Sequence, residues 1–359
     1  MTNPPTPYLS LDRSRVEANI ARLSTHLRSL GVPLRPHVKT AKSIDVARLL
    51  FNGGTGPLTV STLREAEVFG DAGFTDILYA VGIAPDKLDR VRTLRDRGIH
   101  VTVLLDSVAQ ASAVAAQGIP ALLEIDCDGH RGGLRRGDPT IARIADILGD
   151  HLTGVLTHAG ESYFAPSTAD LTAAAEHERA TAVSVAEDLR AAGHPCPVVS
   201  VGATPTAHFA ADLTGVTEVR AGNFVFFDLF MTGLGVCTQA DLALSVVTTV
   251  IGHRPDKGWI LTDAGWMATS RDRSTARQPV DQYYGVVTSL DGTVLPDLLM
   301  TDASQEHGIL SIRPGSTSVL PDLPIGTRLR ILPNHACATA AQHDGYHLGD
   351  TYWPRIHGW

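Results

Sequence analysis

The sequence has little that would direct the protein to a membrane, to the outside of a cell or to nucleic acid. No apolar run reaches the roughly 18 residues that a membrane-spanning helix needs. Residues 1–7 (MTNPPTP) do not show the basic and then apolar pattern of a signal peptide. The net charge of -8 leaves no excess of positive charge to attract nucleic acid or anionic lipid. We therefore expect a cytoplasmic protein with no nucleic-acid partner and no membrane attachment.

Cysteine is also scarce, and none of the four cysteines belongs to a CxxC pair. Scattered thiols of this kind predict no disulfide framework, in keeping with a reducing compartment. We expect Cys127, Cys196 and Cys237 to be packing residues. Cys337 differs from these three because it stands two residues after His335.

The composition is that of a globular protein, with 43% hydrophobic and 19% charged residues. A chain of 359 residues can form an α/β barrel and a second domain. Between about residues 12 and 234, short apolar runs alternate with stretches of helical periodicity. The candidate strands are residues 32–38, 58–61, 77–80, 101–105, 121–125, 153–157, 198–201 and 217–220. The candidate helices are residues 12–30, 62–72, 87–97, 107–117, 141–148 and 171–192.

This strand–helix rhythm predicts an α/β fold with an N-terminal (β/α)8 TIM-type barrel, because eight parallel strands close such a barrel. An open doubly wound sheet is the alternative. After about residue 234 the helical periodicity fades, and Gly and Pro separate β-rich stretches. These stretches are residues 243–252, 259–261, 284–290 and 327–332. We expect a barrel over residues 1–234, whose N-terminal segment can join the second domain, and a mainly β domain over residues 235–359.

Lys39 ends the first candidate strand, where the active site of a parallel barrel forms. A lysine at this position can form a Schiff base if its amine is kept partly neutral. Burial and neighbouring cations have that effect, and Arg35, His37 and Lys42 are such neighbours. A basic surface cluster is the simpler explanation of this segment taken alone.

Later strand ends add further groups that suit a cofactor. Arg131 lies among glycines that can turn a guanidinium onto an anion or a phenolate. His158 can stack on a ring and Tyr163 can hydrogen-bond to one, although a core histidine is the alternative. Small residues and hydroxyls follow the last two strands, at 200–206 and 220–224, where barrels commonly bind phosphate. Together with Lys39, these groups are the components of a site for pyridoxal phosphate (PLP).

His335 and Cys337 are candidate metal ligands. On an extended segment residues i and i+2 face the same side, so the pair can hold one cation, and Zn²⁺ suits nitrogen and sulfur ligands best. Two protein ligands leave positions open for water or substrate. The alternative is a buried cysteine beside a hydrogen-bonded histidine. The polar stretch SQEHG (304–308) can line the same site.

In chain order these segments resemble the fold-type III PLP enzymes typified by alanine racemase. The resemblance is closest to the metal-dependent group of D-serine dehydratase, D-threo-3-hydroxyaspartate dehydratase and D-threonine aldolase, and it covers nearly the whole chain. The segments that carry it are PHVKTAK (36–42), STLREAE (61–67), HAGESY (158–163), SVGATPT (200–206), RAGNFVFFD (220–228), SQEHG (304–308) and PNHAC (333–337).

The resemblance implies a role for each matching residue. Lys39 corresponds to the Schiff-base lysine that also moves the α-proton, Arg131 to the arginine at the PLP 3-hydroxyl and His158 to the histidine stacked on the pyridine ring. Either Tyr163 or Arg220 would meet the ring nitrogen. The implied phosphate-cup positions are Gly202, Ala203, Thr204, Gly222 and Asn223. His335 and Cys337 would bind the divalent metal, with Zn²⁺ the first choice and Mn²⁺ or Mg²⁺ the alternatives.

The resemblance also implies a homodimer, in which the β domain of one subunit closes the barrel mouth of the other, and a D-3-hydroxy amino acid as substrate. Dehydration to a 2-oxo acid and ammonia is favoured over retro-aldol cleavage to glycine and an aldehyde. The reason is that His-x-Cys is the dehydratase pattern of the family, whereas its D-threonine aldolases tend to carry His-x-Asp. A racemase would have no use for the pair, and a non-catalytic PLP-binding protein would lack the second domain.

Three positions depart from the family pattern. Ala41 stands where a second histidine is frequent, Ala203 where a serine is, and Asp128 where a glycine is. The first and third bear on which substrate is preferred, because both positions are close to the cofactor in the family. Ala203 removes one hydroxyl from the phosphate cup and leaves its backbone donors.

Overall fold

The computed structural model describes residues 4–359, and the chain divides into two compact units. One unit contains the residues up to Asn19 together with Val225–Arg355, and the other contains Ile20–Phe224 together with Ile356–Trp359. The boundary predicted from the sequence, between residues 234 and 235, lies ten residues later. Asp228 explains the difference, because its carboxylate accepts hydrogen bonds from the backbone N–H groups of Met231 and Ala336 and so ties this segment to the C-terminal part.

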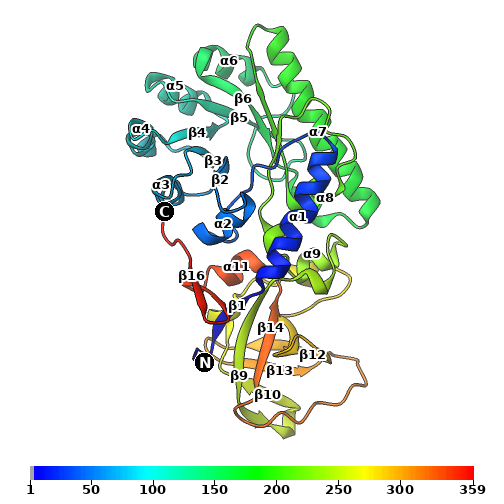
Figure 1. The fold of residues 1–359 in the computed structure, drawn as a ribbon. Helices are drawn as coiled ribbons and strands as arrows, with labels where there is room; N and C mark the ends of the chain where they lie inside the picture. Colours follow the sequence, from blue (N-terminus) through cyan, green and yellow to red (C-terminus); the bar gives the residue numbers. More distant parts are fainter. Residues whose placement is uncertain (1–3) are drawn as a thin grey trace. The chain divides into compact units, whose positions relative to one another are not determined.

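The unit of residues 20–224 is built on seven parallel strands that pair in chain order. They are β2 (Leu58–Val60), β3 (Asp76–Gly82), β4 (His100–Leu105), β5 (Ala121–Ile125), β6 (Leu152–Thr157), β7 (Val198–Val201) and β8 (Glu218–Val219). Helices separate them in sequence and surround them in Figure 1. The helices are α2 (Ile44–Leu50), α3 (Leu63–Asp71), α4 (Leu88–Asp96), α5 (Val108–Ala116), α6 (Pro139–Leu148), α7 (Thr168–Ala191) and α8 (Thr204–Phe209).

The segment predicted as the first strand, residues 32–38, is not a regular strand. It forms only isolated parallel bridges, from Leu34 to Val219 of β8 and from His37 to Thr59 of β2. Pro33 and Pro36 account for this, since a residue without an N–H group interrupts the ladder of hydrogen bonds. The segment is nevertheless hydrogen-bonded to both edge strands of the seven-stranded sheet.

The packing of this unit follows from apolar periodicity. In α6, Ile141, Ile144, Ala145 and Leu148 are buried on one face at the spacing of a helix. Four neighbouring strands each contribute a leucine to one buried cluster. Its members are Leu78, Leu104, Leu122 and Leu156.

The other unit is dominated by a nine-stranded sheet in the order β10-β13-β12-β11-β14-β9-β1-β15-β16. An additional pairing of β10 with β9 closes the first six of these strands into a ring. The strands are β1 (Tyr8–Leu11), β9 (Leu244–Arg254), β10 (Trp259–Thr262), β11 (Gly285–Ser289), β12 (Val294–Ala303), β13 (Gly308–Ile312), β14 (Arg328–Pro333), β15 (Gly345–Leu348) and β16 (Thr351–Pro354). The predicted β-rich stretches correspond to β9, β10, β11 and β14.

The remaining helices are α1 (Arg13–Ser29), which runs across the division between the units, and three short ones. The short helices are α9 (Leu229–Gly233), α10 (Trp266–Thr269) and α11 (Ala336–Ala340). Helix α1 buries the apolar side chains of Val16, Leu23 and Leu27, which recur at helical spacing. Across residues 4–359, no helix has the length and apolarity needed to cross a membrane.

Candidate functional site

Lys39 lies in the turn that follows the 33–38 segment, two positions after His37, whose side chain is partly buried. The backbone N–H of Lys39 donates to His37 Nδ1 over 3.4 Å. Burial, together with the nearby charges of Lys39 and Arg220, lowers the pKa of His37 well below its usual value. His37 is therefore a neutral hydrogen-bonding group at physiological pH. The positive charge in this part of the site is carried by Lys39 and Arg220.

Arg220 follows β8 and is buried, with 4% of its surface exposed. Its guanidinium donates to Ser200 Oγ on β7 at 2.7 Å and to the carbonyl oxygen of Thr157 on β6 at 2.6 Å. Burial lowers the pKa of Arg220 to about 10. The side chain thus joins three strand ends and remains positively charged at neutral pH.

His158 follows β6, and its Nδ1 lies 2.9 Å from the carbonyl oxygen of Gly202. Because a carbonyl oxygen only accepts, Nδ1 carries the hydrogen. This hydrogen bond fixes the orientation of the imidazole ring. Burial, with the charges of Lys39 and Arg131, lowers the pKa of His158 well below its usual value. The Tyr163 ring lies with its centroid 6.1 Å from that of His158.

Arg131 lies in the loop after β5, and half of its side chain is exposed. It pairs with Glu124 Oε1 at 3.4 Å. Gly133 in the same loop has a φ of +102°, and a Cβ there would lie 2.7 Å from the backbone nitrogen of Asp126. The loop therefore requires glycine, as its sequence indicated.

The five predicted phosphate-cup positions follow β7 and β8. Two of them require glycine, since a Cβ at Gly202 would lie 2.0 Å from the carbonyl oxygen of Arg220 and one at Gly222 would lie 2.8 Å from that of His37. Ala203 and Asn223 are buried beside them. Thr204 opens α8, and its buried Oγ1 has no hydrogen-bond partner in the part of the chain that the structure describes.

Glu178 is a buried carboxylate on α7 that the sequence did not single out. Its Oε1 accepts from the backbone N–H groups of Ala159 and Gly202, each at 2.9 Å, and its Oε2 accepts from Thr206 Oγ1 at 2.8 Å. Burial raises the pKa of this carboxyl, while these hydrogen bonds oppose the rise. Glu178 therefore holds together the loops after β6 and β7. A lone acidic residue in a predicted helix gives no spacing signal that could have revealed this.

These groups fit an anionic ring cofactor that carries a phosphate. Lys39, Arg131 and Arg220 all act electrostatically on His37 and His158, so the structure brings the five side chains together. Two neutral rings lie among three cations, and the pairing of Arg131 with Glu124 offsets part of that positive charge. The unpaired Thr204 hydroxyl offers a hydrogen bond at the place predicted for phosphate.

His335 and Cys337 also adjoin, but not on an extended segment as predicted. His335 has extended backbone angles and caps α11, while Cys337 lies in the first turn of that helix. The helix begins here because the Ala336 N–H donates to Asp228 Oδ2 at 2.8 Å, a partner far away in the sequence. The side chains of His335 and Cys337 hydrogen-bond to each other in this arrangement.

Asp272 adds a third group to this pair. Its Oδ2 lies 2.6 Å from His335 Nδ1. The hydrogen bond with His335 lowers the pKa of Asp272 to about 2, and a hydrogen bond with Ser274 contributes to a lesser extent. Burial alone would lower the pKa of His335, but Cys337 and Asp272 raise it well above its usual value. A carboxylate on Nδ1 is the arrangement that orients a histidine to bind a metal through Nε2.

The donor set fits a cation that keeps open coordination positions. Among residues 4–359, no group of three or more His, Cys, Asp or Glu side chains is arranged to hold a metal ion. A metal held by His335 and Cys337 alone would keep positions open for water or substrate. Residues 304–307 form the turn between β12 and β13, and Gly308 begins β13; the part of this stretch in the site stays a prediction.

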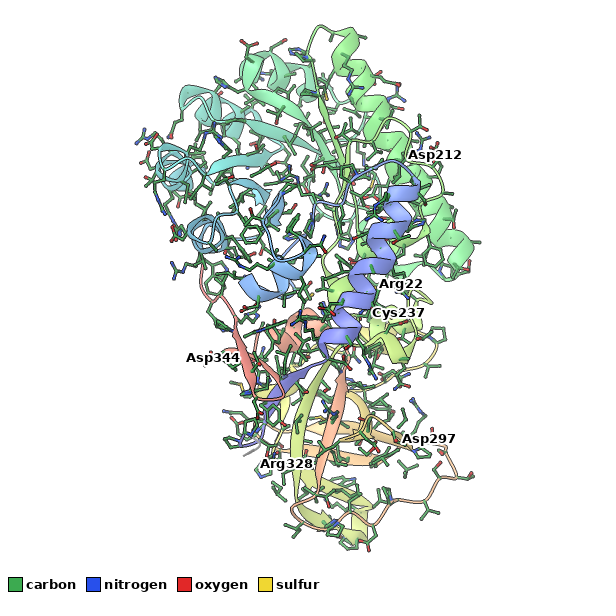
Figure 2. All side chains as sticks on the ribbon, in the orientation of Figure 1. Arg22, Asp212, Cys237, Asp297, Arg328 and Asp344 are labelled. Atoms are coloured by element: carbon green, nitrogen blue, oxygen red, sulfur yellow. The ribbon has the colours of Figure 1, made fainter. Side chains whose placement is uncertain are left out.

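The other cysteines have the surroundings of packing residues. Cys196 and Cys237 are buried, and Figure 2 labels the latter. Cys237 Sγ lies 3.5 Å from Thr232 Oγ1. Burial raises the pKa of Cys127 to about 12, so its thiol stays protonated at neutral pH.

Comparisons with known proteins show which families the two parts of the chain resemble. A family model described as the N-terminal domain of alanine racemase matches residues 11–229, and one for a serine dehydratase domain matches residues 243–348. D-threo-3-hydroxyaspartate dehydratase of Delftia sp. (strain HT23) is 52% identical over 99% of this chain and 98% of its own. Its solved structure has a TM-score of 0.96, with 52% identity and 99% of both chains covered.

More distant relatives also span the chain. D-serine dehydratase of Dictyostelium discoideum is 29% identical over 96% of this chain and 93% of its own. The solved D-threonine aldolase of Filomicrobium marinum has a TM-score of 0.78 and 26% identity, and the match covers 98% of this chain and 95% of the aldolase.

Proposed function

The chain belongs to the alanine racemase-like, fold-type III family of PLP enzymes, and we propose from that membership that it is a metal-dependent dehydratase of D-3-hydroxy amino acids. Within this family it falls in the group of D-threo-3-hydroxyaspartate dehydratase, D-serine dehydratase and D-threonine aldolase, which are lyases. The proposed reaction eliminates the 3-hydroxyl group and yields a 2-oxo acid and ammonia.

PLP, when bound, would supply an electron sink that allows the substrate Cα proton to leave. Lys39 would hold the cofactor through its amine, and its Nζ would then accept the Cα proton. Arg131 would face the cofactor 3-hydroxyl, and the neutral ring of His158, fixed by Gly202, would pack on the pyridine ring.

The remaining cofactor contacts are proposed for the ends of β6, β7 and β8. The phosphate would meet Gly202, Ala203, Thr204, Gly222 and Asn223. For the ring nitrogen the candidates remain Tyr163 and Arg220. The support for Arg220 is its buried guanidinium, whose two hydrogen bonds fix its position.

His335 and Cys337 would hold the divalent metal, with Zn²⁺ the best match to their donor atoms and Mn²⁺ or Mg²⁺ as alternatives. The metal would supply Lewis acidity toward the departing 3-hydroxyl group. Asp272 would fix the His335 ring by accepting its Nδ1 hydrogen. The solved structure of a variant of D-threo-3-hydroxyaspartate dehydratase is in a metal-free form, which supports a metal in this group.

The His335–Cys337 pair carries the proposal of dehydration. A thiolate and an imidazole with a carboxylate behind it form a soft site with open positions, and His-x-Cys is the pattern that the resemblance associates with dehydratases. Aldol cleavage to glycine and an aldehyde is the second candidate, which the likeness to the Filomicrobium D-threonine aldolase favours.

Four further proposals accompany this function. The parallel strands would form a closed (β/α)8 barrel with the 33–38 segment as first strand, supported by its hydrogen bonds to both β8 and β2. The protein would be a homodimer, with functional domains that meet near residue 234. A cytoplasmic location is supported by four free cysteines.

Product analysis tests the proposed function. The purified protein is incubated with PLP and Zn²⁺ and with D-serine, D-threonine or D-threo-3-hydroxyaspartate. We expect stoichiometric 2-oxo acid and ammonia from at least one of them. Glycine and an aldehyde as main products would replace dehydration by aldol cleavage, and interconversion of D- and L-forms would identify a racemase.

A further inference from the structure

A second candidate site lies entirely within the β-rich unit. The pocket has a volume of about 750 Å³ and opens on one face of the nine-stranded sheet. Strands β1, β9, β11 and β14 line it, with the β15–β16 hairpin and the start of α1. None of the proposed PLP or metal ligands lines this pocket.

Arg330 on β14 is the central charged group of the pocket. Its Nη1 donates to Ser10 Oγ at 2.7 Å and to Ser245 Oγ at 3.1 Å, and its Nε donates to the carbonyl oxygen of Leu290 at 2.8 Å. The strand register explains this convergence, because Ser10 stands directly opposite Ser245 and Arg330 opposite Val247. Side chains at alternate positions of neighbouring strands share one face of a sheet.

The guanidinium has no carboxylate partner in the part of the chain that the structure describes. Two carboxylates line the pocket, but both are engaged elsewhere. Asp12 pairs with Arg15 at 3.3 Å, and Asp291 accepts from Ser289 Oγ and from the Thr293 N–H. Burial lowers the pKa of Arg330, because the charged guanidinium loses part of its hydration. A bound anion would reduce this desolvation free energy.

Uncommitted hydrogen-bond donors surround the guanidinium. Ser10 Oγ and Ser245 Oγ both accept from Arg330, so each keeps its own hydrogen to donate, and within residues 4–359 neither donates to a protein acceptor. The Nη2 group of Arg330 forms no hydrogen bond there either. Donors of this kind without an acceptor are complementary to an oxyanion.

The walls of the pocket restrict the body of the ligand. Leu11, Leu332 and Trp353 line it with apolar surface, next to the polar centre at Arg330. Polar surface slightly exceeds apolar surface in this lining, and a pocket of this size suits a small organic molecule that carries a charged group. We propose that this pocket binds a small organic acid, whose carboxylate meets Arg330, Ser10 and Ser245 and whose carbon chain lies against Leu332 and Trp353.

Fluorescence of Trp353 provides a test that does not depend on catalysis. The PLP- and Zn²⁺-loaded protein is titrated with succinate, acetate and inorganic phosphate at constant ionic strength. We expect saturable quenching by the carboxylates, and loss of the signal in Trp353→Phe. Arg330→Gln should weaken binding by about tenfold or more, since a charge-assisted hydrogen bond is removed. Arg328→Gln, on the same strand but outside the pocket, should bind as the wild type does.

A second variant tests the site independently, in case Arg330→Gln does not fold. The double variant Ser10→Ala/Ser245→Ala keeps the charge and removes two donors, and we expect binding several-fold weaker in a protein that circular dichroism shows to be folded at the assay temperature. Tighter binding of phosphate than of either carboxylate would overturn the assignment to organic acids. Absence of saturable quenching, or an equal affinity in the double variant and the wild type, would overturn the site.

Discussion

At residue 39 the chain places an amine near two neutral, partly buried histidines and within the field of Arg131 and Arg220. If this amine holds PLP, Lys39→Ala should lose both the visible absorbance of the bound cofactor and all turnover. Lys87→Ala in the same unit is the control, and it should keep both. Full activity of Lys39→Ala would contradict the assignment of the whole site.

The His335–Cys337 pair makes a separate prediction about the metal. Chelation or Cys337→Ala should abolish dehydration and leave the cofactor absorbance and the thermal transition largely unchanged, because the metal serves the chemistry and not the fold. Cys337→Asp should retain some metal and shift the products toward glycine and an aldehyde. Added Zn²⁺ should restore the chelated wild type but not Cys337→Ala. Metal affinity should fall as the pH is lowered, because the cysteine must bind as a thiolate.

Calorimetric metal titration at several pH values, with Cys237→Ala as the matched control, measures this effect. Cys237 is buried beside Thr232, so its removal should leave metal affinity unchanged. A metal-free sample with full activity would show that the pair is only a cysteine packed beside a histidine.

The sequence could identify residues whose signal is local. Lys39 and Arg131 follow predicted strands, and His335 and Cys337 stand two residues apart. Asp272 gave no such signal, since its role arises only when it folds onto a histidine 63 positions away. Its contribution is therefore visible only in three dimensions.

At the scale of elements, Glu178 on α7 determines how the loops after β6 and β7 sit. Glu178→Ala would leave the buried N–H groups of Ala159 and Gly202 without acceptors, at a cost of about 1–3 kcal/mol each. We expect a lower free energy of unfolding and weaker retention of PLP. Glu178→Gln should recover most of both, because its amide oxygen can accept from the same two N–H groups. Urea unfolding and cofactor absorbance after dialysis measure the two effects.

Thr206 allows that rescue, since its hydroxyl can rotate to accept from the new amide nitrogen where it now donates to Glu178 Oε2. Glu178→Asp, which shortens the side chain, is the matched control and should behave like the alanine variant. Wild-type stability of Glu178→Ala would contradict the anchoring role.

Elements with strong periodicity were predictable, and elements defined by distant partners were not. Helices α1 and α6 and strands β4 and β5 match the apolar patterns that predicted them. The 33–38 segment is not a regular strand, because its prolines lack the N–H groups that a strand ladder requires. Helix α11 was predicted as extended, because the carboxylate of Asp228 that caps its first turn is not visible in the local sequence.

At the scale of the molecule, the two proposed ligand sets belong to different units of one chain. Lys39 and the phosphate-cup residues lie in the unit of the parallel sheet, whereas His335 and Cys337 lie in the β-rich unit. The proposed reaction would need both sets at one substrate. The resemblance implies that this is achieved in a homodimer, in which the β domain of one subunit meets the barrel of the other.

This arrangement predicts complementation between two inactive variants. In a symmetric dimer, a Lys39→Ala chain mixed with a Cys337→Ala chain would pair one intact lysine with one intact cysteine across the interface. We expect co-refolded mixtures to recover about a quarter of wild-type activity, since about half the dimers are mixed and each has one complete site. Sedimentation should show the mass of two chains. No recovery in a mixture that sediments as a dimer would mean that each site is built from one chain, and a fully active monomer would refute the dimer itself.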